Sequence, residues 1–422
     1  MQKPTEPRVF REANTEAQKN ARKKRPRKRF FAVSGAKLVV RLAIVALVLL
    51  GFGGYSIATA IRMVQQGENL PTAAAEVARD SGFSPVVATI ENIYYQYLNP
   101  PKVGGTPAGA AAFDGGNTSA SNQTAVLTPP ANVKAWGPAT AVNHKPARVS
   151  SPLPYQPGEG YWYPTKIKVN GATAVYVARV RPDKIHSSVY SAIAWFDPHL
   201  LAFQQIPGTQ LPEGSFDHGN GRVPAVLRNF YMAGFADGYK MDQSQGGYIN
   251  KGSVVKAMVQ GKATLLTYPN GNIDVVKWNN ANPPTGFTTA RQNLDMMVEN
   301  SKSAVLNEDQ ARWGQVWYGT GSGHNFVWRS GIGIRADGTV VYVQSGALSA
   351  GTLADLLVRA GAVRAMALDM NEAFANGDLY GPYRPRNLAI NPENKNPTNK
   401  FWKRSTRDFV AVYAKSPANG AR

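Results

Sequence analysis

The segment LSAGTLADLLVRAGAVRAMALDMN, from Leu348 to Asn371, changes from the periodicity of a helix to that of a buried strand. Ser349 is a favourable helix N-cap, and apolar residues follow it at the spacing of one helix face. These apolar residues are Leu353, Leu356, Leu357 and Ala360. Gly361 suits the end of the helix, and residues 363–368 are dominated by small and apolar side chains. The segment therefore predicts a helix followed directly by a strand in the core.

Two hairpin signatures precede this segment. Residues 262–278 place an apolar run on each side of Pro-Asn-Gly-Asn, and residues 330–346 do the same around Ala-Asp-Gly. Further upstream, residues 168–182 and 189–198 have the composition of strands and contain the turn signals Asn-Gly and Asp-Pro. Hairpins combined with isolated helices predict an α+β fold, with mixed or antiparallel sheets and flanking helices.

Composition excludes several classes of protein. The chain of 422 residues has no cysteine, which removes disulfides, thiolate metal sites and thiol nucleophiles. The formal net charge of +20 is concentrated near the N-terminus, where residues 1–37 hold twelve Lys and Arg against three Glu. Taken alone, this cluster fits either a nucleic-acid patch or a membrane-surface patch.

The next segment favours the membrane. Residues 42–61 carry no formal charge, and as a helix they would span about 30 Å. We favour an uncleaved anchor over a signal peptide, because residues 55–61 offer only a weak cleavage site. Lys and Arg stay cytoplasmic, so we expect a single-pass cell-membrane protein whose N-terminus is inside and whose chain after Arg62 is outside. Topology and lipid attraction then explain the basic cluster, and we expect no nucleic-acid partner.

The rest of the chain divides by composition. A helical stalk is expected before Pro100, and its tyrosines Tyr94, Tyr95 and Tyr97 are explained by packing, with the membrane interface or a protein partner as alternatives. A Gly-, Ala-, Pro- and Ser-rich tether follows. The predicted organisation is a basic cytoplasmic tail (1–37), a transmembrane anchor (38–62), a helical stalk (63–100), a flexible linker (101–160), a folded domain (161–382) and a basic C-terminal segment (383–422).

The strongest candidate for chemistry is Asp369, which directly follows the predicted buried strand. A sheet fixes such side chains in position while the following loop exposes them. Capping of a turn that begins at Met370 is the alternative explanation. On a helical turn Glu372 would share a face with Asp369, so the two carboxylates could divide acid and base duties, although simple solvent exposure also explains Glu372.

Two further segments carry candidates. Arg329 precedes a strand with spaced glycines, where glycine permits close approach and the guanidinium suits phosphate or carboxylate. Residues 231–248 form a loop rich in Gly and Tyr that contains Asp237 and Asp242. The five histidines never occur at i, i+4 spacing, so we expect no metal, and no motif predicts a cofactor.

In this order, the three segments resemble the phosphodiester glycosidase family, over about residues 161–380 and most closely its bacterial membrane-anchored or exported members. The residues that carry the resemblance are MAGF at 232–235, GGY at 246–248, Arg329 to Gly333, and LDMN at 368–371. The chain departs from the family pattern at Met232, where asparagine is usual, and at Met370 and Asn371, which replace glycines.

The resemblance implies a hydrolase that acts on sugar-phosphate diesters of envelope glycans. It implies that Asp369 activates water or stabilises an oxocarbenium ion and that Arg329 holds the phosphate, the two converging in an open pocket. The implied substrate-binding residues are Asn371, Glu372, Gly234, Asp242 and Gly247. A methionine at position 232 cannot donate amide hydrogen bonds, so a non-catalytic envelope protein that binds glycan on the same fold is the alternative.

Overall fold

The structure, a computed structural model, describes residues 59–61, 63–64, 70–107, 136–140, 146–308, 313, 326–381 and 387–417. These residues belong to one compact unit, which spans Ile44–Arg422. Among them, no helix has both the length and the apolar character needed to cross a membrane. The predicted anchor lies outside the described residues except at positions 59–61, and the basic tail lies wholly outside them.

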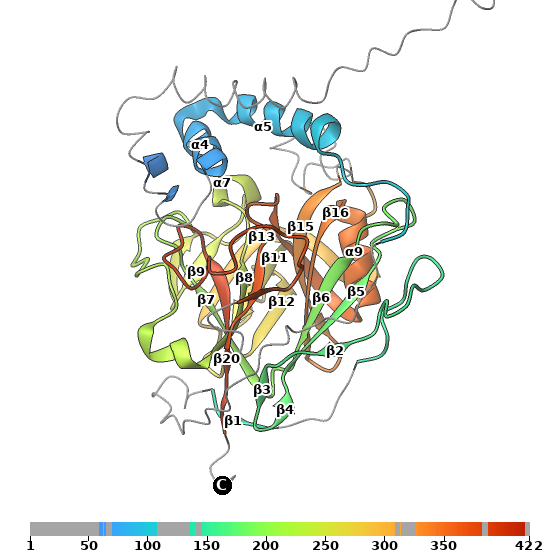
Figure 1. Cartoon of the computed structure of the whole chain (residues 1–422). Helices are drawn as coiled ribbons and strands as arrows, with labels where there is room; N and C mark the ends of the chain where they lie inside the picture. Colours follow the sequence, from blue (N-terminus) through green and yellow to red (C-terminus); the bar gives the residue numbers. More distant parts are fainter. Residues whose placement is uncertain are drawn as a thin grey trace, which may run out of the picture. The chain divides into compact units, whose positions relative to one another are not determined.

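Helices are few in the described part of the chain, and most of it is strand and loop (Figure 1). The helical elements are α4 (Leu70–Ala78), the π-helical turn η1 (Arg79–Phe83), α5 (Ser84–Ile93), a second π-helical turn η2 (Tyr94–Leu98), the 3-10 helix η3 (Ala225–Phe230), α7 (Met241–Ser244) and α9 (Ala350–Arg359). Two small strand pairs join β1 (Pro138–Ala139) to β21 (Ser416–Pro417) and β3 (Lys168–Val169) to β4 (Ala172–Thr173).

Two larger sheets, antiparallel in every described strand pair, build the domain. The first has twelve described strands: β2 (Tyr163–Pro164), β5 (Val175–Val180), β6 (Ser191–Phe196), β9 (Tyr248–Asn250), β10 (Ser253–Lys256), β11 (Lys262–Thr267), β12 (Ile273–Lys277), β13 (Thr289–Glu299), β14 (Lys302–Ser303), β15 (Val327–Arg335), β16 (Val340–Leu348) and β17 (Ala362–Met370). The second has five: β7 (Leu201–Ile206), β8 (Tyr231–Ala236), β18 (Gly377–Leu379), β19 (Leu388–Ala389) and β20 (Phe409–Ala414). The α+β fold with antiparallel sheets and flanking helices is confirmed.

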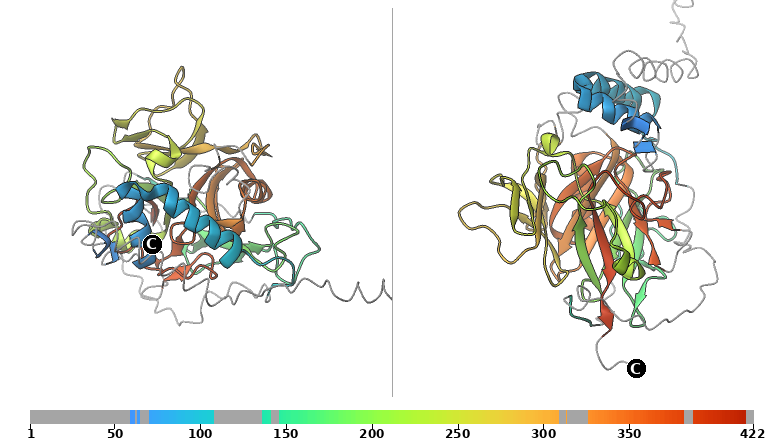
Figure 2. Two further views of the ribbon diagram at one scale, coloured as in Figure 1. Left: turned by 90° about the horizontal axis from the view of Figure 1, so that it is seen from above. Right: turned by 90° about the vertical axis from the view of Figure 1, so that its left-hand side faces the viewer.

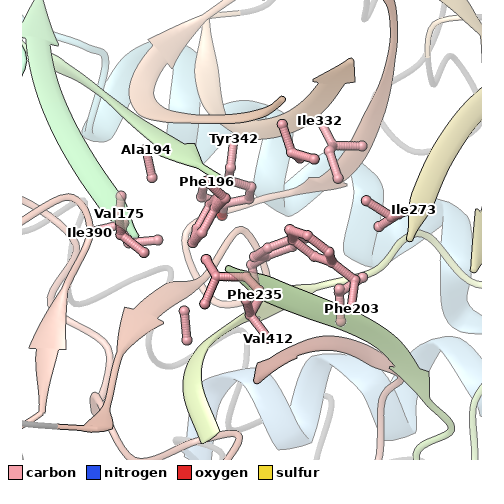
Figure 3. Close-up of a cluster of buried hydrophobic side chains, with 14 of the residues drawn as sticks. Val175, Ala194, Phe196, Phe203, Phe235, Ile273, Ile332, Tyr342, Ile390 and Val412 are labelled. Atoms are coloured by element: carbon pink, nitrogen blue, oxygen red, sulfur yellow. The ribbon is translucent and has the colours of Figure 1, made fainter. Parts of the chain in front are cut away.

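The main core lies where side chains of the two sheets meet (Figure 3). Phe196 of β6 contacts Phe203 of β7 and Phe235 of β8, with ring centroids 6.1 and 6.0 Å apart. Phe235 also stacks on Tyr342 of β16 at 4.7 Å. Aromatic side chains bury large apolar areas, so this contact between the sheets is a main source of stability.

The helix predicted after Ser349 is confirmed as α9, which packs on the other face of the large sheet. Ser349 Oγ accepts a hydrogen bond from the backbone N–H of Thr352 at 3.1 Å, and Gly361 ends the helix at a φ of +89°. Gly331 of β15 makes room for this helix, since a Cβ there would lie 3.1 Å from Leu357, whereas a Cβ on Gly333 would lie 2.6 Å from Ala362 of β17. The close approach that these glycines permit is therefore by helix α9 and by β17 and not by a ligand.

The C-terminal segment, which sequence composition placed outside the domain, contributes a central strand. Strand β20 pairs with β7 on one side and with β8 on the other. Its residues Phe409–Tyr413 are buried throughout, because one face meets the main core and the other a second cluster around Tyr231 and Phe401. An apolar run of six residues in a basic, Asn- and Pro-rich stretch was too short a signal to predict this position.

The end of the predicted linker also belongs to the folded part. Residues 146–160 are described and packed: Val149 N donates to Gly160 O at 2.9 Å, and Glu159 forms a buried ion pair with Arg181. The Pro- and Ser-rich composition of this segment concealed its packing. The folded domain therefore starts at or before residue 146, earlier than the predicted residue 161.

The predicted stalk is helical, but its helices contact the domain. Helices α4 and α5 lie across one end of the two sheets, as the views in Figures 1 and 2 agree. Tyr95 of η2 donates its hydroxyl hydrogen to Asn371 Oδ1 at 2.8 Å, which supports the packing explanation for that tyrosine. Tyr97 is exposed, so a protein partner at this point stays a prediction.

Candidate functional site

Charged side chains contact one another at one end of the sheets. Helices α4 and α5 cover this end (Figure 1). Antiparallel pairing brings the last residues of some strands beside the first residues of others. Asp369 lies near the end of β17, and Arg329 lies opposite Met370 near the start of β15. Asp237 directly follows β8, and the backbone N–H of Asp237 meets the carbonyl of Asp408, which directly precedes β20. Strand ends distant in sequence thus share one polar site.

Hydrogen bonds hold both the carboxylate of Asp369 and the strand that carries it. Its Oδ1 accepts a hydrogen bond from the backbone N–H of Met370 at 2.9 Å, and its Oδ2 accepts one from Arg407 Nη2 at 3.1 Å. Asn293 of β13 steadies the strand by donating to the carbonyls of Ala367 and Leu368 at 2.7 and 2.8 Å. Burial raises the pKa of Asp369 to about 6, although Arg407 and the Met370 amide oppose the rise. Such a carboxylate can exchange a proton near neutral pH.

Arg329 and Asp369 both act on Tyr239, Arg329 by a hydrogen bond and by its charge and Asp369 by its charge. Arg329 forms a hydrogen bond with the tyrosine side chain, and its Nε donates to Leu348 O at 2.9 Å. Burial raises the pKa of Tyr239, with Arg329 opposing the rise and Asp369 adding to it. Both predicted residues are 2% exposed. The structure therefore places both near Tyr239 in buried surroundings and not in the open pocket that was expected, because Asp369 contacts Arg407 and the N-terminal helices lie over this end of the sheets (Figure 1).

A second set of ionisable side chains adjoins the first. Arg291 of β13 donates its Nε to Asp408 Oδ2 at 2.9 Å inside the domain. Burial and the Asp408 charge raise the pKa of Asp237 well above its usual range, and Arg291 opposes this only in part. Among the described residues, three buried oxygens here have no hydrogen-bond partner: Oδ1 of Asp237, of Asp408 and of Asn293. Such oxygens can accept hydrogen bonds from water or from sugar hydroxyls.

Next to Asp369 lies a cavity of about 450 Å³, which residues of α4 and of the domain line together. Arg407, Lys240, Phe374 and Thr406 come from the domain, and Glu76 and Asp80 come from the helical segment. Neither Arg329 nor Asp369 is among its lining residues. Arg407 reaches both places, because its guanidinium contacts Asp369 and borders the cavity.

Asn371 and Glu372 lie in a turn, because β17 continues to Met370 and no helix starts there. Asn371 has a φ of +80°, a conformation that asparagine adopts more easily than most residues, which explains how it replaces a glycine of the family pattern. Its side chain contacts Tyr95 and Glu91 of the helical segment. Glu372 is half-buried and does not share a helical face with Asp369. Burial raises the pKa of Glu372, against the effect of Lys395.

The other predicted binding residues have different surroundings. Gly234 lies within β8, where a Cβ would come within 2.0 Å of the Tyr231 hydroxyl. Gly247 is equally crowded, since a Cβ there would lie 2.3 Å from Ala257 O. Packing thus explains both glycines. Asp242 is exposed on α7.

The residues predicted from the sequence did not include Arg407, Asp408, Arg291, Lys240 or Glu76. The rule that selected Asp369, polar residues at the end of a buried strand, applies equally to Arg407 and Asp408 before FVAVYA. Arg291 and Lys240 carried no comparable local signal. Among the described residues, no group of three or more His, Asp or Glu side chains has an arrangement suited to a metal ion.

Comparisons with known proteins connect this site to a family. Residues 223–369 match the family model described as phosphodiester glycosidase. No curated protein matches the chain. The match ends at Asp369, so Arg407 and Asp408 lie beyond it.

Among solved structures, the chain is similar to the catalytic domain of zebrafish N-acetylglucosamine-1-phosphodiester alpha-N-acetylglucosaminidase auto-inhibited by its pro-peptide. The identity is 14% and the TM-score 0.38, over 57% of this chain and 82% of that chain. A hypothetical protein from Synechocystis has 11% identity and a TM-score of 0.38, over 60% of this chain and 64% of that one. A Burkholderia pseudomallei K96243 protein described as exported has 12% identity and a TM-score of 0.31, over 53% and 74%.

The fold and site are those of an antiparallel α+β domain with a buried carboxylate next to guanidinium groups. The resemblance to the phosphodiester glycosidase family is confirmed by the match of residues 223–369. The match of residues 223–369 to that family supports a glycosidase-like function.

Proposed function

We propose that this protein hydrolyses sugar-phosphate diesters of envelope glycans, with Asp369 as the reacting carboxylate. The observation that carries the proposal is the position of Asp369: it is the last residue of the family match and a buried acid with a pKa of about 6 beside Arg407. A carboxylate that changes protonation near neutral pH suits acid–base work at an anomeric carbon.

The reaction follows from the bond that is broken. Water attacks the anomeric carbon, the bond from that carbon to the phosphate oxygen breaks, and the phosphate leaves as a stable anion that needs little proton donation. Asp369 takes the proton of the attacking water, or its charge stabilises the oxocarbenium-like transition state. Arg329 holds Tyr239 beside this carboxylate and keeps positive charge near it.

The experiment is hydrolysis by the purified full-length protein of a panel of sugar-phosphate diesters and of aryl glycosides that lack phosphate. We expect turnover of the diesters, and much slower turnover of the glycosides, because an aryloxide leaves less readily than a phosphate. Equal rates on the two groups would contradict the role assigned to the phosphate. If the protein hydrolysed none of the diesters, including those in isolated envelope polymers, the proposed function would be wrong.

The pH dependence gives a second test of Asp369. Because burial raises its pKa to about 6, the carboxylate is protonated below that pH and cannot take a proton from water. We expect kcat/KM to rise as pH increases through about 6 and then to level off. Residual activity of Asp369→Asn should lack this inflection. A wild-type profile that is flat from pH 5 to 7 would exclude Asp369 as the base.

We also propose that the domain works outside the cytoplasm on a single membrane anchor. The support is the uncharged run at residues 42–61 after the basic tail. Protease added to spheroplasts should remove a C-terminal epitope tag, and deletion of residues 1–62 should release the protein from membranes. Protection of the tag until the membrane is lysed would contradict this topology.

A non-catalytic glycan-binding role is the second candidate. Two observations favour it: Met232 stands where the family has asparagine, and both Arg329 and Asp369 are buried. This role is consistent with binding of a diester by the full-length protein without turnover, and turnover that depends on Asp369 would exclude it.

A further inference from the structure

Two cations of the domain point at one carboxylate of the N-terminal helical segment. Lys240 Nζ lies 2.8 Å from Glu76 Oε2, and Arg407 Nη1 lies 3.8 Å from the same oxygen. The other oxygen of Glu76, Oε1, forms an ion pair with Arg79 Nη1 of its own segment at 2.7 Å. Lys240 also contacts Asp80 at 2.7 Å. One glutamate oxygen thus lies between the ammonium and the guanidinium of the domain.

The domain holds these two cations in place. Lys240 precedes α7, shortly after β8, and Arg407 precedes β20, so neighbouring strands β8 and β20 bring them together. The Arg407 guanidinium lies 4.1 Å from the Phe374 ring centroid and donates to Gly238 O. Both cations are at most 8% exposed. Lys and Arg are almost never buried to this extent without an anion, so the pair calls for one.

Glu76 supplies that anion in this structure. Burial alone would raise its pKa, but Lys240, Arg407 and Arg79 outweigh burial and lower the pKa to about 2. The carboxylate is therefore charged at every physiological pH. An oxyanion with at least two oxygens, held by one ammonium and one guanidinium, is chemically close to a phosphate.

The position of the cations connects them to the reacting carboxylate. Arg407 contacts Glu76 through Nη1 and Asp369 through Nη2. An anion in place of Glu76 would therefore lie on the other side of the same guanidinium from Asp369. The adjoining cavity of about 450 Å³ falls in the usual range of small-ligand sites. A phosphate at the cations would place an attached sugar either in this cavity or toward Asp369.

We propose that Lys240 and Arg407 form the subsite for the phosphate of a sugar phosphodiester, and that Glu76 occupies this subsite as an internal substitute. The identity of the ligand rests on the proposed function, whereas the anion-binding property rests on the contacts alone. Glu76 and phosphate need the same N–H donors, so they exclude each other. The ligand must displace helix α4, whose segment also contacts Asn371 through Glu91 and Tyr95.

Binding of an unreactive anion tests the subsite. The full-length protein is titrated calorimetrically with dimethyl phosphate and with inorganic phosphate, as wild type and as Glu76→Gln. Loss of the internal carboxylate should tighten binding of both anions about tenfold or more, because a site filled by its own side chain loses apparent affinity in proportion to the time it is filled. Lys240→Met, added to Glu76→Gln, should abolish the gain.

Controls separate the subsite from unspecific charge effects. Glu299→Gln removes an exposed carboxylate that pairs with Lys277, and it should leave anion affinity unchanged. Asp80→Asn removes an exposed ion-pair partner of Lys240 without changing the core. It should tighten anion binding, as Glu76→Gln does. This variant therefore tests the subsite if Glu76→Gln does not fold. Faster proteolysis within residues 70–98 on addition of phosphate is expected, because the anion displaces these helices.

The outcomes also separate this inference from the proposed function. Equal anion affinity of wild type, Glu76→Gln and Asp80→Asn would overturn the subsite even if diesters were hydrolysed. Tighter binding by Glu76→Gln that Lys240→Met reverses, without hydrolysis of any diester, would establish the subsite and remove the enzymatic function. Hydrolysis with a KM that Glu76→Gln lowers and Lys240→Met raises would support both.

Discussion

Replacing Asp369 with asparagine is expected to lower kcat/KM for sugar phosphodiesters by about 10²- to 10⁴-fold, the usual contribution of a positioned acid or base. Asparagine keeps the shape of the side chain, and its oxygen can still accept hydrogen bonds from the Met370 amide or from Arg407. It cannot take a proton or carry a negative charge. The fold should therefore persist while the chemistry is lost, which steady-state kinetics and a thermal melt of the same sample would measure.

A control distinguishes this loss from general damage. Glu372→Gln changes a carboxylate three residues away in the turn after β17, and it should reduce kcat/KM far less, because the side chain of Glu372 is half-buried and does not share a face with Asp369. If Asp369→Asn turned over diesters as fast as wild type, the carboxylate would have no place in the reaction.

Replacing Glu159 with alanine is expected to destabilise the domain by about 3–5 kcal/mol, the usual effect of stranding one partner of a buried ion pair. Glu159 is 0% exposed and accepts hydrogen bonds from the Arg181 guanidinium at 2.7 Å and from Ser151 Oγ at 2.8 Å. Burial would raise its pKa, but these hydrogen bonds outweigh burial and lower it. Without the carboxylate, Arg181 stays buried, and Tm should fall by roughly ten degrees.

The matched control for this prediction is Glu299→Ala, which removes an exposed ion pair with Lys277 and should cost about 1 kcal/mol or less. Chemical denaturation of both variants gives the comparison. If Glu159→Ala were no less stable than Glu299→Ala, residues 146–160 would not be an integral part of the folded domain.

The position of the N-terminal helices should affect the pKa of Asp369, because both contact Arg407. Glu76 shares Arg407 with Asp369, so the state of the helical segment affects the surroundings of the reacting carboxylate. When Glu76 leaves, Arg407 loses one anion and can interact more strongly with Asp369, which would lower the pKa of that carboxylate below about 6. The acid limb of kcat/KM, which reports the free enzyme, therefore also indicates whether Glu76 leaves Arg407 before substrate binds.

Local features of the chain were predictable because their causes are local. The turn sequences around Gly271 and Gly338 form the hairpins β11–β12 and β15–β16, and Ser349 and Gly361 delimit α9. Asp369 was predictable as a site residue for the same reason, because the small and apolar residues that mark the end of a buried strand lie within the eight positions before it. The family resemblance of residues 223–369 likewise depends on short motifs that survive in the sequence.

The sequence by itself thus determined the α+β class, two hairpins, helix α9 and the position of one acidic residue at a strand end. Only the tertiary structure decided that β20 lies between β7 and β8, that Arg407 meets Asp369, and that Glu76 from the predicted stalk reaches the same guanidinium. The physical reason is that periodicity and turn chemistry act over a few residues. The contact between Glu76 and Arg407 depends on how helix α4 packs against strands that are distant in the chain, which no local pattern of side chains encodes.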